Sequence, residues 1–195
     1  MGKGLVYVFS GEGKGKTSAA LGVAIRMLLG NKRVVWVSWF KCADWNISEM
    51  GLPQKFVRQM RMYWMGEGFY VKEPSEISEG VKIAKLIKGC VKDKSSFERH
   101  KKAAHRALEK VKAELISANP PDMVVMDESI QAINDGLLTE KEVIDVLEIR
   151  GKVHMVLTGR GVTSGLVKYS DLVTEMRKVK HPYDTGILAV RGLDY

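Results

Sequence analysis

The chain has 195 residues, 45% hydrophobic and 28% charged, which is ordinary for a globular protein, and we expect one domain over residues 1–195. Its longest apolar stretch, residues 34–40, is too short to cross a bilayer, and the first strand starts too early to leave room for a secretion signal, so we expect a cytoplasmic protein. The net charge of +8 suggests a polyanionic ligand, but lysines scattered over residues 72–118 are typical of solvated helix faces, and no nucleic-acid recognition module is recognisable.

Residues 5–17 combine a buried strand, a glycine-rich turn and the start of a helix. Residues 5–9 are apolar, residues 10–17 read Ser-Gly-Glu-Gly-Lys-Gly-Lys-Thr, and a helix rich in alanine and leucine is predicted up to residue 29. A phosphate-binding loop has this context, because glycines let backbone N–H groups curl around an anion at a helix N-terminus. The sequence therefore predicts that the chain binds a nucleoside triphosphate.

The loop also suggests roles for individual side chains. Lys16 is predicted to reach the terminal phosphates, and the Thr17 hydroxyl to ligate Mg²⁺. The expected ATP-binding residues are Ser10, Gly11, Glu12, Gly13, Lys14, Gly15, Lys16, Thr17 and Ser18. The loop departs from the usual pattern, since Ser10 replaces the first glycine, glycines occupy every second position, and Lys14 adds a cation.

The remaining elements alternate between strand and helix. The sequence predicts a strand at 33–40, an irregular segment at 41–53, a short strand at 55–59, a loop at 66–68, and helices at 79–91 and 96–117. It then predicts a strand at 123–126, a helix at 140–150 capped by Thr139, and strands at 153–157 and 172–174. This order indicates an α/β fold of the P-loop NTPase (RecA-like) type, with a mostly parallel sheet and helices on both faces.

Asp127 and Glu128 directly follow the apolar strand 123–126. Carboxylates at the C-terminal end of a strand beside a phosphate loop bind Mg²⁺ directly or through water. Acidic residues also favour helix N-termini, so this pair alone is a weak signal. With the phosphate loop present, it predicts a site for Mg²⁺ or Mn²⁺ formed by Thr17, Asp127 and Glu128.

Three further clusters contain residue types that occur in binding sites. They are Gly66-Glu67-Gly68-Phe69, Leu157-Thr158-Gly159-Arg160 and Lys180-His181-Pro182-Tyr183-Asp184-Thr185-Gly186-Ile187. Each also has an ordinary structural explanation: a turn before a core aromatic residue, a surface cation, or a loop histidine packed against a tyrosine. No Ser/His/Asp or Cys/His arrangement is identifiable.

Taken in order, these segments resemble the P-loop corrinoid adenosyltransferases, which adenosylate cob(I)alamin or cobyrinic acid diamide with ATP. The matching stretches are residues 6–21, 65–69, 124–128, 136–138, 156–160, 173–176 and 180–187. The alternating-glycine loop, Leu-Thr-Gly-Arg and Lys-His-Pro-Tyr-Asp-x-Gly are specific in combination, although none is specific alone.

The resemblance implies transfer of the 5′-deoxyadenosyl group of ATP to the Co(I) of a reduced corrinoid, releasing triphosphate, in coenzyme B12 synthesis or salvage. Family members bind ATP reversed relative to most P-loop proteins, with the γ-phosphate deep in the loop. The triphosphate is then the leaving group and needs charge neutralisation along its length. The implied catalytic residues are Lys16, Thr17, Glu128 and Arg160, with Lys14 assisting. Co(I) is itself the nucleophile, so no protein general base is expected.

Departures from the family pattern gather on the expected corrinoid side. Family members place a Gly-Phe-x-Trp segment beneath the corrinoid, and here Phe69 matches whereas Tyr70 and Val71 replace the usual Thr and Trp. These three residues and His181 are the expected corrinoid-binding residues. Further departures are Ser38, Cys42, Ser129 and Ile130. Many members also carry an N-terminal extension over the corrinoid, which we do not expect here.

The resemblance further implies a reduced flavoprotein as electron donor and a homodimer, with cob(I)alamin or another corrinoid as substrate. Two alternatives stay open from the sequence. One is a sensor that binds ATP or corrinoid without turnover, motivated by Val71 and by the N-terminal extension that we do not expect here. The other is a P-loop ATPase associated with nucleic acid, motivated by the net charge.

Overall fold

The computed structural model describes residues 2–68 and 97–194, in which six strands form one parallel sheet. The strand order is β3-β2-β4-β5-β1-β6, and every neighbouring pair is parallel. The strands are β1 (Val6–Ser10), β2 (Val34–Ser38), β3 (Met60–Trp64), β4 (Met123–Asp127), β5 (His154–Thr158) and β6 (Leu172–Glu175).

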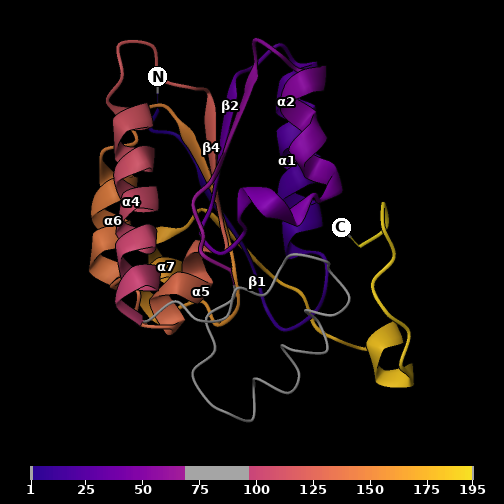
Figure 1. Cartoon of the computed structure of the whole chain (residues 1–195). Coiled ribbons are helices and arrows are strands. Elements are labelled where there is room, and N and C mark those ends of the chain that lie inside the picture. Colours follow the sequence, from indigo (N-terminus) through magenta and orange to yellow (C-terminus); the bar gives the residue numbers. More distant parts are fainter. Residues whose placement is uncertain (1, 69–96, 195) are drawn as a thin grey trace.

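Helices cover both faces of the sheet, as Figure 1 shows. One face carries α1 (Lys16–Leu29) and the short α2 (Leu52–Lys55). The other carries α4 (Phe97–Leu115), α5 (Ser129–Asn134), α6 (Glu140–Glu148) and α7 (Ser164–Tyr169). Short 3₁₀ helices lie at Ala43–Trp45, Ser48–Gly51 and Pro182–Thr185. In this part of the chain, none of the helices combines the length and apolar character needed to cross a membrane.

Alternation along the strands divides the core into two layers. In β1, Val6 and Val8 belong to the layer beneath α4, α6 and α7, whereas Tyr7 and Phe9 pack toward α1. Both faces of a parallel sheet are covered, so its strands are apolar at nearly every position. This explains why β2 and β4 are buried throughout.

The predicted fold class is confirmed, and the sheet is parallel throughout rather than mostly parallel. The strand expected at 55–59 was wrong, because α2 extends to Lys55 and the strand is β3, which starts at Met60. β3 lies at a sheet edge and is only partly buried, so its apolar signal is weak. Helices α5 and α7 were not predicted, since six residues are too few for a helical period to stand out. The helix expected at 79–91 lies outside the described residues.

The register of the sheet aligns the strand ends that carry the motifs. Ser38 at the end of β2 pairs with Asp127 at the end of β4, and Phe9 in β1 pairs with Thr158 at the end of β5. The segments that follow these strands therefore converge at the carboxyl edge. Ligands of open α/β sheets bind in the crevice at this edge.

Candidate active site

The phosphate loop between β1 and α1 packs closely against the segment that follows β6. The Gly13 N–H donates to the Met176 carbonyl at 2.6 Å. A Cβ added to Gly11 would lie 2.5 Å from the Met176 oxygen, and one on Gly13 would lie 2.7 Å from the Arg177 carbonyl carbon. Two of the alternating glycines are therefore required by this close backbone approach. Gly15, with φ of 115°, supplies the left-handed residue that opens α1.

Lys16 folds back into the loop. Its Nζ donates to the carbonyl oxygens of Gly11 and Gly13 at 2.7 and 2.8 Å. Burial lowers the pKa of Lys16, and the Arg160 charge lowers it further, whereas Glu12 and Glu128 oppose this shift. Its hydrogen-bond partners are neutral carbonyls rather than a carboxylate, so the charge is not cancelled within the contact. The ammonium can therefore attract an incoming anion.

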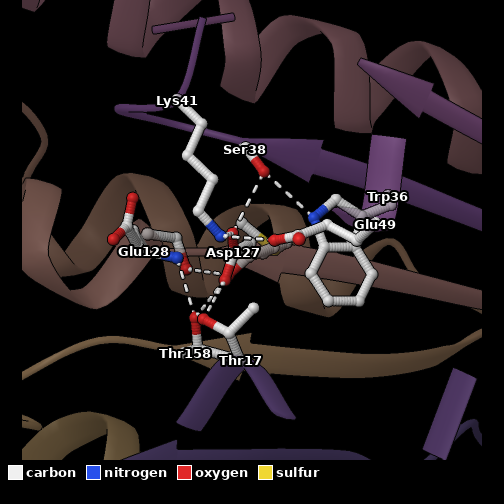
Figure 2. Close-up of polar contacts among 10 residues, drawn as sticks. Thr17, Trp36, Ser38, Lys41, Glu49, Asp127, Glu128 and Thr158 are labelled. Carbon is white, nitrogen blue, oxygen red and sulfur yellow. Dashed lines mark hydrogen bonds and ion pairs between the residues drawn. The ribbon is translucent and has the colours of Figure 1, made fainter. Parts of the chain in front are cut away.

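Asp127 is the centre of a hydrogen-bond network that joins four elements (Figure 2). It is completely buried at the end of β4. Its Oδ1 accepts from the Thr17 hydroxyl at 3.2 Å and the Thr158 hydroxyl at 2.8 Å. Its Oδ2 accepts from the Ser38 hydroxyl at 3.1 Å and the Lys41 ammonium at 2.8 Å. Burying a carboxylate is costly unless its oxygens are hydrogen-bonded, and here each oxygen accepts from two donors.

Lys41 supplies the positive charge in this network. Its side chain is 10% exposed and its ammonium also lies 3.4 Å from a carboxylate oxygen of Glu49. Burial lowers the pKa of Lys41, but the charges of Asp127, Glu128 and Glu49 raise it well above its ordinary value. Lys41 is therefore a permanently charged residue within the site.

Glu128 differs from its neighbour Asp127. Its φ of 65° is left-handed, and its N–H donates to the Thr158 hydroxyl at 2.8 Å. This backbone turns its carboxylate away from Asp127, as Figure 2 shows. Its Oε2 is buried and has no hydrogen-bond partner among the described residues. Burial and the Asp127 charge raise the pKa of Glu128 to about 7, although Lys41 opposes the shift.

The donor set at Thr17 and Glu128 fits a divalent cation. In residues 2–68 and 97–194, no group of three or more His, Cys, Asp or Glu side chains could hold a metal by itself. Mg²⁺ commonly binds through one or two protein oxygens and completes its shell with substrate phosphates and water. The unpartnered Oε2 of Glu128 suits this role. Asp127 is saturated, so its contacts favour a supporting role over direct ligation.

Two further cations flank the loop. Arg160 follows β5, and its Nη1 lies 2.9 Å from a carboxylate oxygen of Glu12, with both side chains more than half exposed. Lys14 forms an ion pair with Asp194 near the C-terminus, and burial lowers the pKa of Lys14. Exposed pairs of this kind contribute little to stability, so both cations can exchange their carboxylates for a ligand.

A cavity of about 580 Å³ opens beside the loop. One wall consists of Lys14, Thr17 and Ser18, and another of Lys41, Trp45 and Glu49. Residues 189 and 192–194 of the C-terminal segment line it as well. Cavities of about 300–1,000 Å³ are typical of small-molecule sites, and this one combines apolar walls with a few charged groups.

The structure brings together most of the site residues predicted from the sequence. Those around the loop and the cavity are Glu12, Lys14, Lys16, Thr17, Ser18, Glu128 and Arg160. Ser10 is buried, and its hydroxyl accepts from the Val162 N–H at 3.2 Å, so it holds the neighbouring loop. His181 is absent from the described cavity walls, and its Nδ1 accepts from the Tyr183 N–H within its own turn. The predictions for Phe69, Tyr70 and Val71 lie outside the described residues.

Four polar residues of the site were not predicted to act there. They are Ser38, Lys41, Glu49 and Thr158. Ser38, Lys41 and Thr158 could have been predicted from the sequence, because each ends or closely follows a strand at the carboxyl edge of the sheet. Glu49 had no such signal, since it lies eight residues from Lys41 in a segment expected to be irregular.

Comparison with known proteins decides the family. A sequence profile for ATP:corrinoid adenosyltransferase BtuR/CobO/CobP matches residues 2–195. The chain belongs to the corrinoid adenosyltransferase family. It is 31% identical to a corrinoid adenosyltransferase of Pseudomonas aeruginosa, over 99% of this chain and 84% of that protein. It is 32% identical to corrinoid adenosyltransferase CobA of Salmonella typhimurium, over 99% of this chain and 86% of that protein.

The resemblance predicted from the motifs is therefore confirmed, and the chain is a transferase of a family that adenosylates corrinoids. ATP and a corrinoid are the substrates that membership in this adenosyltransferase family implies. Among solved structures, a KaiC-like protein of Pyrococcus horikoshii aligns with a TM-score of 0.43 at 14% identity, covering 91% of this chain and 74% of that chain. The ADP form of an ATP-binding cassette aligns with a TM-score of 0.36 at 18% identity, covering 89% of this chain and 77% of that chain.

Proposed function

We propose that this adenosyltransferase transfers the 5′-deoxyadenosyl group of ATP to the Co(I) of a reduced corrinoid and releases inorganic triphosphate. The observation that carries the proposal is the set of cations, Lys14, Lys16 and Arg160, around a loop that ends at Thr17. Thr17 lines the same cavity as Glu128, whose Oε2 has no hydrogen-bond partner among the described residues. These groups suit a ligand with several negative charges and a bound cation.

In the proposed reaction, the cobalt electron pair attacks the 5′ carbon of ATP and forms the Co–C bond. The bond between that carbon and the triphosphate oxygen breaks, and its electron pair leaves with the triphosphate. The cobalt is thereby oxidised from Co(I) to Co(III), and no proton is transferred. A site for this reaction needs cations along the leaving group and exclusion of water, but no general base.

The residues of this chain would divide that work by position. Lys16 lies inside the loop and would neutralise the phosphates held there, while Lys14 and Arg160 would neutralise those nearer the surface. Thr17 and Glu128 would hold Mg²⁺ or Mn²⁺, which supplies further neutralisation of the triphosphate when bound. The cavity bounded by Lys41 and Trp45 would receive the nucleoside end of ATP.

The corrinoid side of the proposal rests on the sequence resemblance. We propose that Phe69, Tyr70 and Val71 contact the corrinoid, with a contribution from His181. We also propose a reduced flavoprotein as the electron donor, a homodimer and a cytoplasmic location, as the resemblance implies.

The decisive experiment is an anaerobic assay with Mg-ATP and a chemically reduced corrinoid. It follows the loss of Co(I) absorbance and identifies the phosphate product. We expect one Co–C bond per triphosphate released. ATP binding without product would favour the sensor, and release of ADP and single phosphate, increased by added polynucleotide, would favour the nucleic-acid-associated ATPase. Lys101→Ala, on the exposed face of α4, is a control that should keep full activity.

A further inference from the structure

Lys41 lies within the candidate site but takes no part in the proposed transfer of the adenosyl group. Its ammonium lies between the carboxylates of Asp127 and Glu49, at 2.8 and 3.4 Å, and the residue lines the cavity. Figure 2 shows this side chain reaching from the segment after β2 to the same carboxylate that Thr17 and Thr158 contact. Asp127 therefore links the buried Lys41 ammonium to the Thr17 hydroxyl at the end of the phosphate loop.

The backbone holds Lys41 rigidly in this place. Its carbonyl oxygen accepts from the Gly66 N–H at 3.1 Å, and the Phe40 carbonyl accepts from the Gly68 N–H at 3.0 Å. A Cβ on Gly66 would lie 2.1 Å from the Phe40 carbonyl carbon, so the two segments pack without space for a side chain. The lysine thus starts from a fixed backbone and ends at a fixed carboxylate.

The charge balance explains why a cation is needed there. The carboxylates of Glu49 and Glu128 line the cavity proposed for Mg-ATP, and Asp127 contacts Thr17 beside it, so negative charge gathers where an anionic ligand would bind. Like charges in a poorly hydrated site repel strongly. Lys41 forms ion pairs with the carboxylates of Asp127 and Glu49. The Lys41 charge therefore offsets that of Asp127, while Glu128 keeps one oxygen without a hydrogen-bond partner in residues 2–68 and 97–194.

We propose that Lys41 is a positioning residue of the nucleotide site: it neutralises Asp127 and, through that carboxylate, orients the Thr17 hydroxyl, leaving Glu128 as the carboxylate open to the nucleotide-bound metal. This inference rests on the proposed function only in taking Mg-ATP as the ligand. Lys41 acts through Asp127 and does not itself hold the phosphates.

A double-mutant cycle tests this mechanism, because residues that act through one another give non-additive effects. The proteins are wild type, Lys41→Met, Asp127→Asn and the double variant, and the measurement is the Mg-ATP dissociation constant by calorimetry. We expect each single variant to weaken binding by at least about tenfold and the double variant to be no weaker than the worse single variant. Effects that multiply would overturn the inference, since Lys41 would then act independently of Asp127. Unchanged binding in Lys41→Met would overturn it as well.

Two further variants separate positioning from general destabilisation. Lys41→Arg keeps the charge and should bind Mg-ATP within about threefold of wild type, even if Lys41→Met fails to fold. Lost binding in a folded Lys41→Arg protein would refute a role based on charge. Lys32→Met is the matched control, because Lys32 pairs with Asp122 at 3.4 Å at the opposite edge of the sheet and its side chain is 55% exposed. It should leave the dissociation constant unchanged.

The double-mutant cycle measures Mg-ATP binding and not adenosyl transfer. Its result can therefore be distinguished from the result of the assay for the proposed function. A wild-type protein that binds Mg-ATP but forms no Co–C bond would refute adenosyl transfer and leave the cycle interpretable. A wild-type protein that adenosylates a corrinoid but gives a multiplicative cycle would refute only the role of Lys41.

Discussion

Replacement of Glu128 by glutamine should stabilise the nucleotide-free protein at neutral and alkaline pH. The pKa of Glu128 is raised from its ordinary 4.5 to about 7, chiefly by burial. The folded protein therefore binds this proton more tightly than the unfolded chain. The associated stability is fully present below about pH 4.5 and is lost as the pH rises through about 7.

The size of the effect follows from the same pKa. One pKa unit corresponds to about 1.4 kcal/mol, so the ionised carboxylate costs the folded protein at most about 3 kcal/mol. Glutamine is neutral at every pH and avoids this cost. The free energy of unfolding of Glu128→Gln should exceed that of wild type by little near pH 5 and by up to about 3 kcal/mol near pH 8.

The assay is urea unfolding of both proteins across this pH range, with a chelator present and no nucleotide. Glu109→Gln is the matched control, because Glu109 is 68% exposed and pairs with Lys112 on the surface of α4. Its pH profile should parallel that of wild type. If the free energy of unfolding of Glu128→Gln changes with pH as that of wild type does, burial does not disfavour the ionised Glu128 carboxylate and the reasoning fails. The same variant should bind Mg-ATP more weakly, because it lacks the proposed metal ligand.

The remaining predictions concern the loop, the network and one close contact. Lys16→Ala should weaken ATP binding by about 10- to 100-fold, measured by calorimetry, because an ion-paired hydrogen bond contributes about 1.5–3 kcal/mol; unchanged activity would mean that the loop has been misinterpreted. Thr158→Val removes the donor 2.8 Å from Asp127 and should lower the free energy of unfolding by about 1–3 kcal/mol in urea titrations. Gly66→Ala should prevent or strongly weaken folding, because its Cβ would lie 2.1 Å from Phe40, whereas Gly22→Ala, with open space around it, should not lower the melting temperature.

Local sequence patterns were sufficient to locate the glycine-rich loop and the acidic pair of the candidate site. The loop is one continuous segment whose strand, glycines and helix are neighbours in the chain, so its conformation depends mainly on short-range interactions. The same holds for Asp127 and Glu128, which follow an apolar strand directly. The alternation of strands and helices predicted the parallel sheet for a similar reason, since parallel strands need crossover helices.

Only the tertiary structure decided what these residues do to one another. The register that sets Ser38 beside Asp127 depends on the packing of two strands that lie 89 residues apart. The same packing brings Lys41 to the Asp127 carboxylate, and the left-handed backbone at Glu128 turns the Glu128 carboxylate away from it. Adjacent acidic residues thus receive different environments: both oxygens of Asp127 accept from two donors, whereas the Oε2 of Glu128 has no hydrogen-bond partner among the described residues. Sequence alone specifies the chemical groups, but burial and long-range contacts determine their charge and availability, because both depend on the whole fold.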